Sequence, residues 1–197
     1  MAMQETEFIW FNGEFVPWHE AKVHVLTHGL HYGTSAFEGI RAYKTPDGPA
    51  IFRHREHLQR LYESARLFHK EIPYTIDELR SATKELIVRN GLDECYIRPL
   101  ATRGYGFMGL NPLESPVDVV IAVWPWGSYL GEEGTTNGIR AKISSWRRFG
   151  GDALMPHAKT SGQYLNNILA KMETLHAGYD EAIMLDGRGM VSEGSGE

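Results

Sequence analysis

Lys159 is the residue whose type and setting most directly suggest covalent chemistry. The amine of a lysine adds to a carbonyl carbon when it is neutral and held in place. Lys159 follows an irregular stretch that contains Pro156 and stands just before a predicted helix, which could hold it rigidly. Taken alone, Lys159 has a simpler interpretation, because most lysines are surface residues.

Three other charged residues could bind charged groups. The guanidinium groups of Arg60 and Arg98 can each hold a carboxylate or a phosphate with two hydrogen bonds. The carboxylate of Glu193 favours a cationic partner. Simple alternatives exist, because Arg60 lies off the apolar stripe of its predicted helix and Glu193 stands beside a turn. Tyr96 shares a strand face with Arg98, since side chains alternate with a period of two.

The sequence predicts an α+β unit in its first part. Asn12-Gly13 indicates a tight hairpin, and a capping box of Thr75 and Glu78 begins the second of two amphipathic helices. The first helix is expected around residues 58–68. Strands are expected at residues 8–11, 14–16, 23–26, 36–43, 49–52, 95–102 and 117–124.

A second segment follows a glycine-rich stretch. It is expected to contain a strand near 139–146, a helix with Leu165, Ile168, Leu169, Met172 and Leu175 on one face, and strands at 182–185 and 190–192. These elements are too few to cover their own apolar faces. We therefore predict a small α+β domain at 1–125, a linker at 126–138, and an incomplete large domain at 139–197.

Composition narrows the class of protein. The 197 residues carry a net charge of -5, which argues against non-specific binding to nucleic acid. No apolar run approaches the roughly 20 residues that span a bilayer, and the first residues lack a secretory pattern. The single cysteine, Cys95, excludes an internal disulfide. We expect a cytoplasmic protein without membrane contact.

Two further patterns carry little weight. Residues 104–109 match the glycine spacing of a dinucleotide-binding turn, but Pro112 follows where a helix would have to begin. The histidines at 24, 28 and 31 have loose metal-like spacing without cysteine or carboxylate partners. We expect neither a dinucleotide nor a metal.

An ordered set of motifs runs the length of the chain and resembles the branched-chain amino-acid aminotransferases, which are two-domain enzymes of fold-type IV. The motifs are His31-Tyr32-Gly33, Phe37-Glu38-Gly39-Ile40-Arg41, Phe52-Arg53-His54, Tyr96-Ile97-Arg98-Pro99, Trp126-Gly127-Ser128-Tyr129, 157–167 (HAKTSGQYLNN) and 191–197 (VSEGSGE). Members of this family are about half as long again. The resemblance therefore implies that a third of the fold, including a second phosphate-binding turn, lies beyond these residues.

The resemblance implies pyridoxal 5'-phosphate (PLP) as the cofactor. Lys159 would bind it covalently and carry the substrate's α-proton, and Glu193 would keep the ring nitrogen protonated. Arg60 would bind the phosphate, with Gly194 and Ser195 adding close backbone approach. Tyr164 would donate to the phenolic oxygen.

The substrate site is implied in the same way. Tyr32, Phe37, Trp126 and Tyr129 would form a pocket for branched aliphatic side chains. Arg98, with the hydroxyl groups of Tyr32 and Tyr129, would receive the distal carboxylate of glutamate, and Tyr96 would help to bind the α-carboxylate. The implied reaction is amino transfer between leucine, isoleucine or valine and 2-oxoglutarate, so that the partners are small amino and oxo acids.

Several alternatives remain open at this stage. Two relatives on the same fold are a D-amino-acid aminotransferase and an aminodeoxychorismate lyase, against which the motifs at 96–99 and 126–129 favour the branched-chain type. A catalytically incompetent fragment and a binding domain without chemistry are alternatives of other classes. Family resemblance also implies a homo-oligomer, a dimer or larger.

Overall fold

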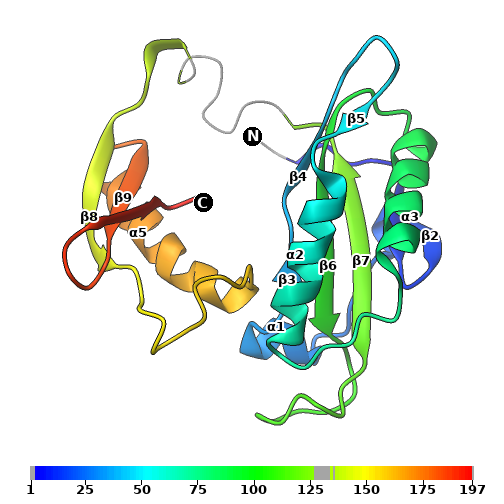
Figure 1. The fold of residues 1–197 in the computed structure, drawn as a ribbon, viewed down its shortest axis with the longest axis horizontal. Coiled ribbons are helices and arrows are strands. Elements are labelled where there is room, and N and C mark those ends of the chain that lie inside the picture. The colour runs from blue at the N-terminus through cyan, green and yellow to red at the C-terminus, as the bar shows by residue number, and fades with distance from the viewer. Residues whose placement is uncertain (1–2, 127–133, 135, 197) are drawn as a thin grey trace. The chain divides into compact units, whose positions relative to one another are not determined.

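The chain folds into two compact units in a computed structural model that describes residues 3–126, 134 and 136–196 (Figure 1). The first unit comprises Met1–Trp126 together with Ala158–Ser161, and the second comprises Gly127–His157 and Gly162–Glu197. Residues 158–161 belong to the first unit, where Thr160 forms a β-bridge with Ala36 of its sheet. The predicted linker at 126–138 lies largely outside the described residues.

An antiparallel sheet is the centre of the first unit. Its strands are β1 (Phe8–Phe11), β2 (Glu14–Pro17), β3 (Ala36–Phe37), β4 (Ile40–Tyr43), β5 (Ala50–Ile51), β6 (Cys95–Arg103) and β7 (Val117–Trp124). Their order is β2-β1-β7-β6-β4-β5, with β3 also paired to β6. The long β6–β7 pair holds Tyr96 opposite Trp124 and Arg98 opposite Ala122.

Two helices, α2 (His54–Arg66) and α3 (Ile76–Arg89), pack against this sheet. Leu58 and Leu61 of α2 and Leu79 and Leu86 of α3 are fully buried in the core. The predicted capping box is confirmed, because Glu78 N–H donates to Thr75 Oγ1 at 3.2 Å and Thr75 N–H donates to Glu78 Oε2 at 2.6 Å.

The predicted hairpin around Asn12-Gly13 is confirmed, with φ of 49° and 98° at the two turn residues. The strand predicted at 23–26 is wrong, because this segment is a loop that ends in a turn. It has no neighbouring strand to pair with among the described residues, and Val25 is 70% exposed. A 3-10 helix (Trp18–Glu20) and the short helix α1 (His28–Tyr32) flank the loop, and neither was predicted.

The second unit is a three-stranded sheet with one helix among its described residues. Its elements are β8 (Ala141–Arg147), the 3-10 turn Ser161–Gln163, α5 (Tyr164–His176), β9 (Glu181–Leu185) and β10 (Val191–Gly194). The helix α5 connects the parallel strands β8 and β9, and β10 returns antiparallel to β9. The predicted strands and helix are confirmed, with small shifts at their ends.

The apolar side of α5 is exposed within this unit. Ala170 packs with Ala182 and Met184 of β9. The remaining buried positions of α5 are the polar residues Asn167 and Thr174. The helix contacts its sheet through a narrow and partly polar surface. Its larger apolar residues are exposed, and these are Leu165, Ile168, Met172 and Leu175.

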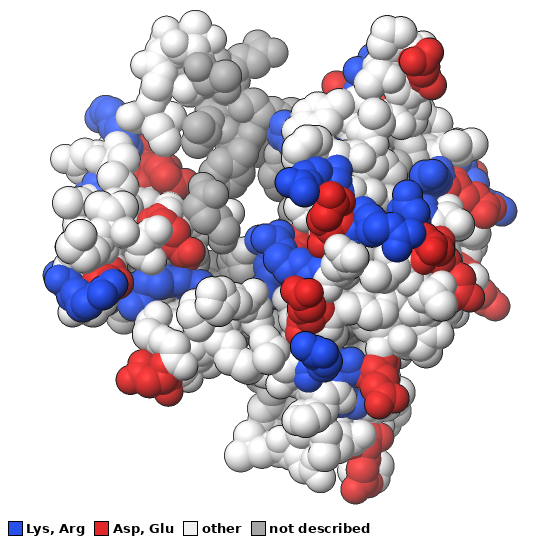
Figure 2. Space-filling view, in the orientation of Figure 1, with Lys and Arg blue, Asp and Glu red and all other residues white. Residues whose placement is uncertain are grey.

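Charged side chains of both signs are intermingled on the face of the first unit seen in Figure 2. Several of them pair, as Arg55 does with Asp77 at 2.5 Å. Within the part of the chain that the structure describes, no helix is long and apolar enough to cross a membrane.

Candidate functional site

The main chain of Lys159 is fixed to two elements of the first unit. Its carbonyl oxygen accepts the N–H of Phe37 in β3 at 3.1 Å. Its own N–H donates to Ser64 Oγ of α2 at 3.0 Å. The residue is half-buried. The lysine predicted to act covalently therefore starts from an anchored backbone, although its segment is irregular.

The ring of Phe37 lies close to two cations. Lys159 Nζ is 5.6 Å from the ring centroid, and the guanidinium carbon of Arg98 is 4.6 Å from it. Both distances are in the range of cation–π attraction. Three of the predicted site residues are thus together, and the aromatic ring stands beside both positive charges.

Arg98 is a half-buried cation whose hydrogen bonding is incomplete. Its Nη2 donates to the hydroxyl of Tyr96 at 2.9 Å. Its Nε is buried and has no hydrogen-bond partner, and no carboxylate of the described residues forms an ion pair with it. A buried unpaired donor on a cation is costly. An anionic ligand would remove this cost.

Tyr96 is held by aromatic neighbours. Its ring lies 4.9 Å from that of Trp124 and is stacked 4.7 Å from that of Trp126. Gly39 permits this position, because a Cβ atom at residue 39 would overlap the Tyr96 hydroxyl. The predicted pocket residues Phe37, Tyr96 and Trp126 therefore border the guanidinium group of Arg98 or stack on one another.

Arg60 is paired with a carboxylate that had no predicted role. Its Nε and Nη2 donate to the two oxygens of Glu38 at 2.5 and 2.7 Å. His57 Nδ1 lies 2.9 Å from the same carboxylate. The side chain of Glu38 is fully buried, whereas that of Arg60 is 48% exposed. One helical turn separates Arg60 from Ser64, which binds the main chain of Lys159.

The two predicted tyrosines of the pocket are not in this cluster. Tyr32 lies in α1, and its ring contacts are with His28 at 4.6 Å and with His31 at 6.4 Å. Among the described residues no ring contact joins Tyr32 to Phe37 or Tyr96. Tyr129 lies outside the described residues, as does the rest of its motif after Trp126.

In the second unit, Glu193 belongs to a polar network. Its Oε1 forms an ion pair with Arg148, whose Nε is 2.7 Å away, and accepts a hydrogen bond from Asn167 Nδ2 at 3.1 Å. The predicted cofactor residues Gly194 and Ser195 follow directly. The hydroxyl of Ser195 donates to Glu181, and its carbonyl oxygen accepts from Asn167 at 3.2 Å. Tyr164, the first residue of α5, is half-buried.

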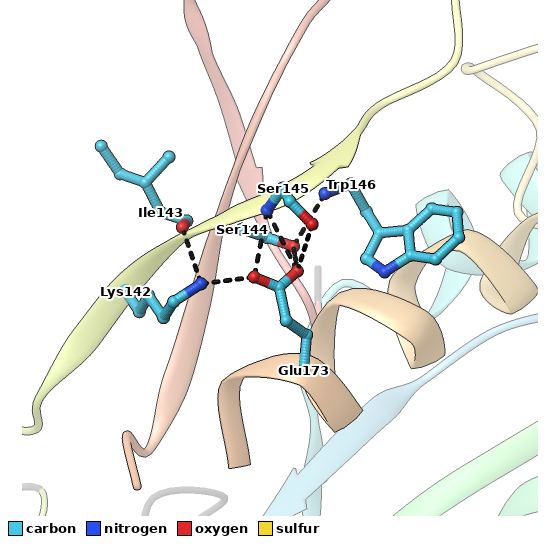
Figure 3. A network of polar contacts seen from close by, with 6 residues as sticks. All are labelled: Lys142, Ile143, Ser144, Ser145, Trp146 and Glu173. Carbon is cyan, nitrogen blue, oxygen red and sulfur yellow. Dashed lines mark hydrogen bonds and ion pairs between the residues drawn. The ribbon is translucent and has the colours of Figure 1, made fainter. Parts of the chain in front are cut away.

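A second polar network fastens α5 to β8 (Figure 3). The carboxylate of Glu173 accepts from Lys142, from Ser144 Oγ at 2.7 Å and from Ser145 N–H at 3.0 Å. These hydrogen bonds, that of Lys142 first, lower the pKa of Glu173 to about 2. This network connects β8 to α5 and so supports the helix that carries Asn167.

The Glu173→Gln variant is expected to unfold at a lower temperature at neutral pH. A carboxyl group whose folded pKa lies below its unfolded value stabilises the fold above the unfolded value, and this contribution is lost as the pH falls through the folded pKa. The difference from the original chain should therefore shrink between pH values of about 4.5 and 2. Calorimetry across this range is the measurement, with exposed Asp152→Asn as control. A difference in melting temperature that does not change with pH would contradict the lowered pKa of Glu173.

Glu38, Arg148 and Asn167 are among the residues of these networks that had no predicted role. Glu38 and Asn167 stand inside the sequence motifs given above. The partners of the three residues are 19 to 45 positions away in the chain. Only a prediction of how β3 meets α2, and how α5 meets β8 and β10, would have identified them.

The chain belongs to a known family. A family model described as "Amino-transferase class IV" matches residues 35–197, which is most of the sequence. Membership follows from this coverage and agrees with the resemblance found in the sequence motifs.

Individual relatives extend the comparison over the whole chain. The branched-chain-amino-acid aminotransferase of Escherichia coli strain K12 is 48% identical over 198 residues, covering 100% of this chain and 64% of the relative. A crystal structure of the Escherichia coli branched-chain amino acid aminotransferase matches with a TM-score of 0.94 at 48% identity, covering 97% of this chain and 63% of that one. The branched-chain amino acid aminotransferase from Thermobaculum terrenum, solved in its PLP form, is 32% identical with a TM-score of 0.86 and covers 96% and 62%.

These matches confirm the predicted fold-type IV architecture. They also show that the chain spans slightly less than two thirds of the length of the relatives it matches.

Proposed function

We propose that this protein is a PLP-dependent transaminase that exchanges an amino group between leucine, isoleucine or valine and 2-oxoglutarate. The observation that carries the proposal is the half-buried Lys159, fixed by its main chain and placed with Arg98 beside the ring of Phe37. The relatives' names support the substrate class.

The chemistry of the residues fits PLP. The cofactor carries an aldehyde, an anionic phosphate and a ring nitrogen that must be protonated, and the chain offers a lysine, arginines and a carboxylate. The unpaired Nε of Arg98 supports an anionic occupant of the first unit, which could be a substrate carboxylate. The cofactor, when bound, supplies an electron sink for the bond to the substrate's α-hydrogen.

In this proposal the cofactor-binding residues have distinct roles. Lys159 binds the cofactor and its Nζ moves the substrate's α-proton. Arg60 holds the phosphate, to which Gly194 and Ser195 bring the main chain. Tyr164 donates to the phenolic oxygen, and Glu193 holds the proton of the ring nitrogen.

The proposed substrate site contains both apolar and polar contact residues. Phe37 and Trp126, with Tyr32 and Tyr129, bind the branched side chain of the first substrate. Such a pocket discriminates by shape at about 1–3 kcal/mol per methylene. Arg98 binds the distal carboxylate of 2-oxoglutarate, and Tyr96 contributes to the α-carboxylate contact.

A substrate panel with the purified chain and added PLP tests the proposal. L-leucine, L-isoleucine and L-valine should each yield glutamate from 2-oxoglutarate, and D-alanine should not. Turnover with D-alanine alone would overturn the substrate assignment in favour of a D-amino-acid aminotransferase. Release of pyruvate from aminodeoxychorismate would favour the lyase. A chain that binds PLP at Lys159 without any turnover would be an incompetent fragment.

The proposal extends to assembly and compartment. We propose a cytoplasmic homo-oligomer, a dimer or larger. The buried, unpaired Cys95 supports a reducing compartment. The resemblance of the sequence motifs to the branched-chain amino-acid aminotransferases supports the homo-oligomer. Sedimentation should give at least twice the mass of the chain, and a monomer at every concentration would contradict it.

A further inference from the structure

We propose that Asn167, together with Arg148, is a positioning residue that clamps Glu193 by one oxygen and leaves the other oxygen for a cationic ring nitrogen. This inference rests on the proposed function, because it gives Glu193 a pyridinium partner. It assigns roles to two residues that had no predicted role, and every contact that carries it lies within the second unit.

Asn167 is the centre of the clamp. It lies on the face of α5 that meets the sheet and is 3% exposed. Its Oδ1 accepts from Arg148 Nη1 at 3.0 Å, and its Nδ2 donates to Glu193 Oε1 at 3.1 Å and to the carbonyl oxygen of Ser195 at 3.2 Å. The orientation of this amide is fixed chemically, because a guanidinium group only donates and carboxylate and carbonyl oxygens only accept.

Arg148 holds the same carboxylate from a second direction. Its Nε forms an ion pair with Glu193 Oε1 at 2.7 Å, and its guanidinium group lies 3.9 Å from the ring centroid of Phe149. Its main-chain N–H donates to Leu185 of β9 at 2.8 Å. The side chain is 12% exposed. Arg148 is therefore anchored by its backbone, by an aromatic ring and by two polar partners.

The backbone of β10 also directs Glu193. Pairing with β9 shifts between Val191, opposite Leu185, and Glu193, opposite Met184, so that Ser192 is an extra residue. A bulge of this kind re-aims the side chain next to it. The position of Glu193 is thus set by an irregular strand and by two side-chain partners.

The contacts are unequal between the two carboxylate oxygens. The ion pair at 2.7 Å from Arg148 and the hydrogen bond from Asn167 both involve Oε1, and among the described residues no hydrogen bond to Oε2 is found. A carboxylate held by one oxygen keeps the lone pairs of the other for a directional contact. Oε2 is the atom that we assign to the ring nitrogen.

Asn167 also ties the carboxylate to the turn that follows it. One Nδ2 atom donates to Glu193 and to Ser195, so the acid and the proposed phosphate-binding residues move together. Loss of this amide should disturb both ends of the cofactor site. The expected effect is larger than for a residue that supports one contact.

The test uses adjacent residues of the same type as matched controls. Asn167→Ala and Arg148→Lys remove the clamp, whereas Asn166→Ala and Arg147→Lys alter the neighbouring side chains, which do not touch Glu193. The dissociation constant for PLP is measured by titration of the purified chain. We expect an increase of about tenfold for Asn167→Ala and Arg148→Lys, as is found when a supporting hydrogen bond of a bound group is lost. The controls should stay within about twofold.

A conservative variant and a spectroscopic readout separate positioning from packing. Asn167→Asp keeps the size and the acceptor for Arg148 but sets a second carboxylate against Glu193, so PLP binding should be weaker than in Asn167→Ala. With ¹⁵N-labelled PLP, the ring-nitrogen resonance should move toward the unprotonated form in Asn167→Ala and Arg148→Lys and in neither control. If Asn167 only fills space, Asn167→Asp should bind PLP more tightly than Asn167→Ala, and the ring-nitrogen resonance should not move in either variant.

The outcomes distinguish the two proposals. An original chain that takes up no PLP overturns both. A chain that binds PLP, with Asn167→Ala, Asn167→Asp and Arg148→Lys indistinguishable from the controls in affinity and in the ring-nitrogen resonance, overturns the clamp alone. Melting temperatures of all variants show whether a loss of binding accompanies a loss of fold. Arg148→Lys, which keeps its charge, provides a second and independent variant.

Discussion

The Lys159→Ala variant is expected to lose all covalent attachment of PLP. Borohydride reduction of the original chain in the presence of PLP should give a stable adduct on Lys159, located by peptide mass mapping. Alanine has no amine with which the aldehyde of the cofactor could react. Where turnover is measurable, it should fall by about four orders of magnitude, because the same amine moves the α-proton.

Lys22→Ala is the matched control for this experiment. Lys22 is an exposed lysine of the first unit, and its removal should leave the adduct unchanged. An adduct of equal yield in Lys159→Ala, or one that maps to another lysine in the original chain, would refute the enzyme assignment. Ligand binding that is independent of PLP and survives Lys159→Ala would instead indicate a binding domain.

Replacing Arg60 with methionine is expected to destabilise the first unit by about 3 kcal/mol. The reason is that Glu38 is much more deeply buried than Arg60. Arg60 is half exposed, whereas the carboxylate of Glu38 is fully buried and would lose its guanidinium partner, with His57 remaining beside it. A buried carboxylate without its ion pair is far more costly than a solvated guanidinium group without one. Urea unfolding followed by tryptophan fluorescence measures the change.

Arg55→Met provides a control at equal exposure. Arg55 is on the same helix and is also 48% exposed, but its partner Asp77 is 69% exposed. Its loss should cost less than about 1 kcal/mol, as for a surface pair. The double variant Glu38→Gln/Arg60→Met should regain part of the stability lost in Arg60→Met. Equal losses in Arg55→Met and Arg60→Met would show that burial of Glu38 does not matter.

Local signals predicted much of the fold. The capping box at Thr75 and the Asn-Gly hairpin depend on atoms within a few residues, and both appear as expected. The segment 23–26 shows the opposite case. Its apolar residues favour a strand, but a strand needs a neighbour, and only the tertiary structure decides whether one is available.

The chemistry of the site was less accessible from sequence. Lys159, Phe37, Arg98 and Tyr96 were predicted through a resemblance in motifs, and the first unit brings them together. Helical periodicity, in contrast, indicated Arg60 as a solvated charge. Its ion pair with Glu38 joins positions 22 apart, which no local pattern contains. The polar inner face of α5 is hidden in the same way, because Asn167 has the pattern of an ordinary helix residue.

Gly39 gives the aromatic wall of the first unit an unusual sensitivity. A single methyl group there would overlap the hydroxyl of Tyr96, the atom that accepts from Arg98. The stacked rings of Tyr96 and Trp126 would have to tilt, and the hydrogen bond from the arginine would be disturbed. Directed-evolution libraries aimed at bulkier or differently charged ligands can therefore alter this aromatic wall by substituting residue 39. None of the aromatic residues of the wall has to be changed.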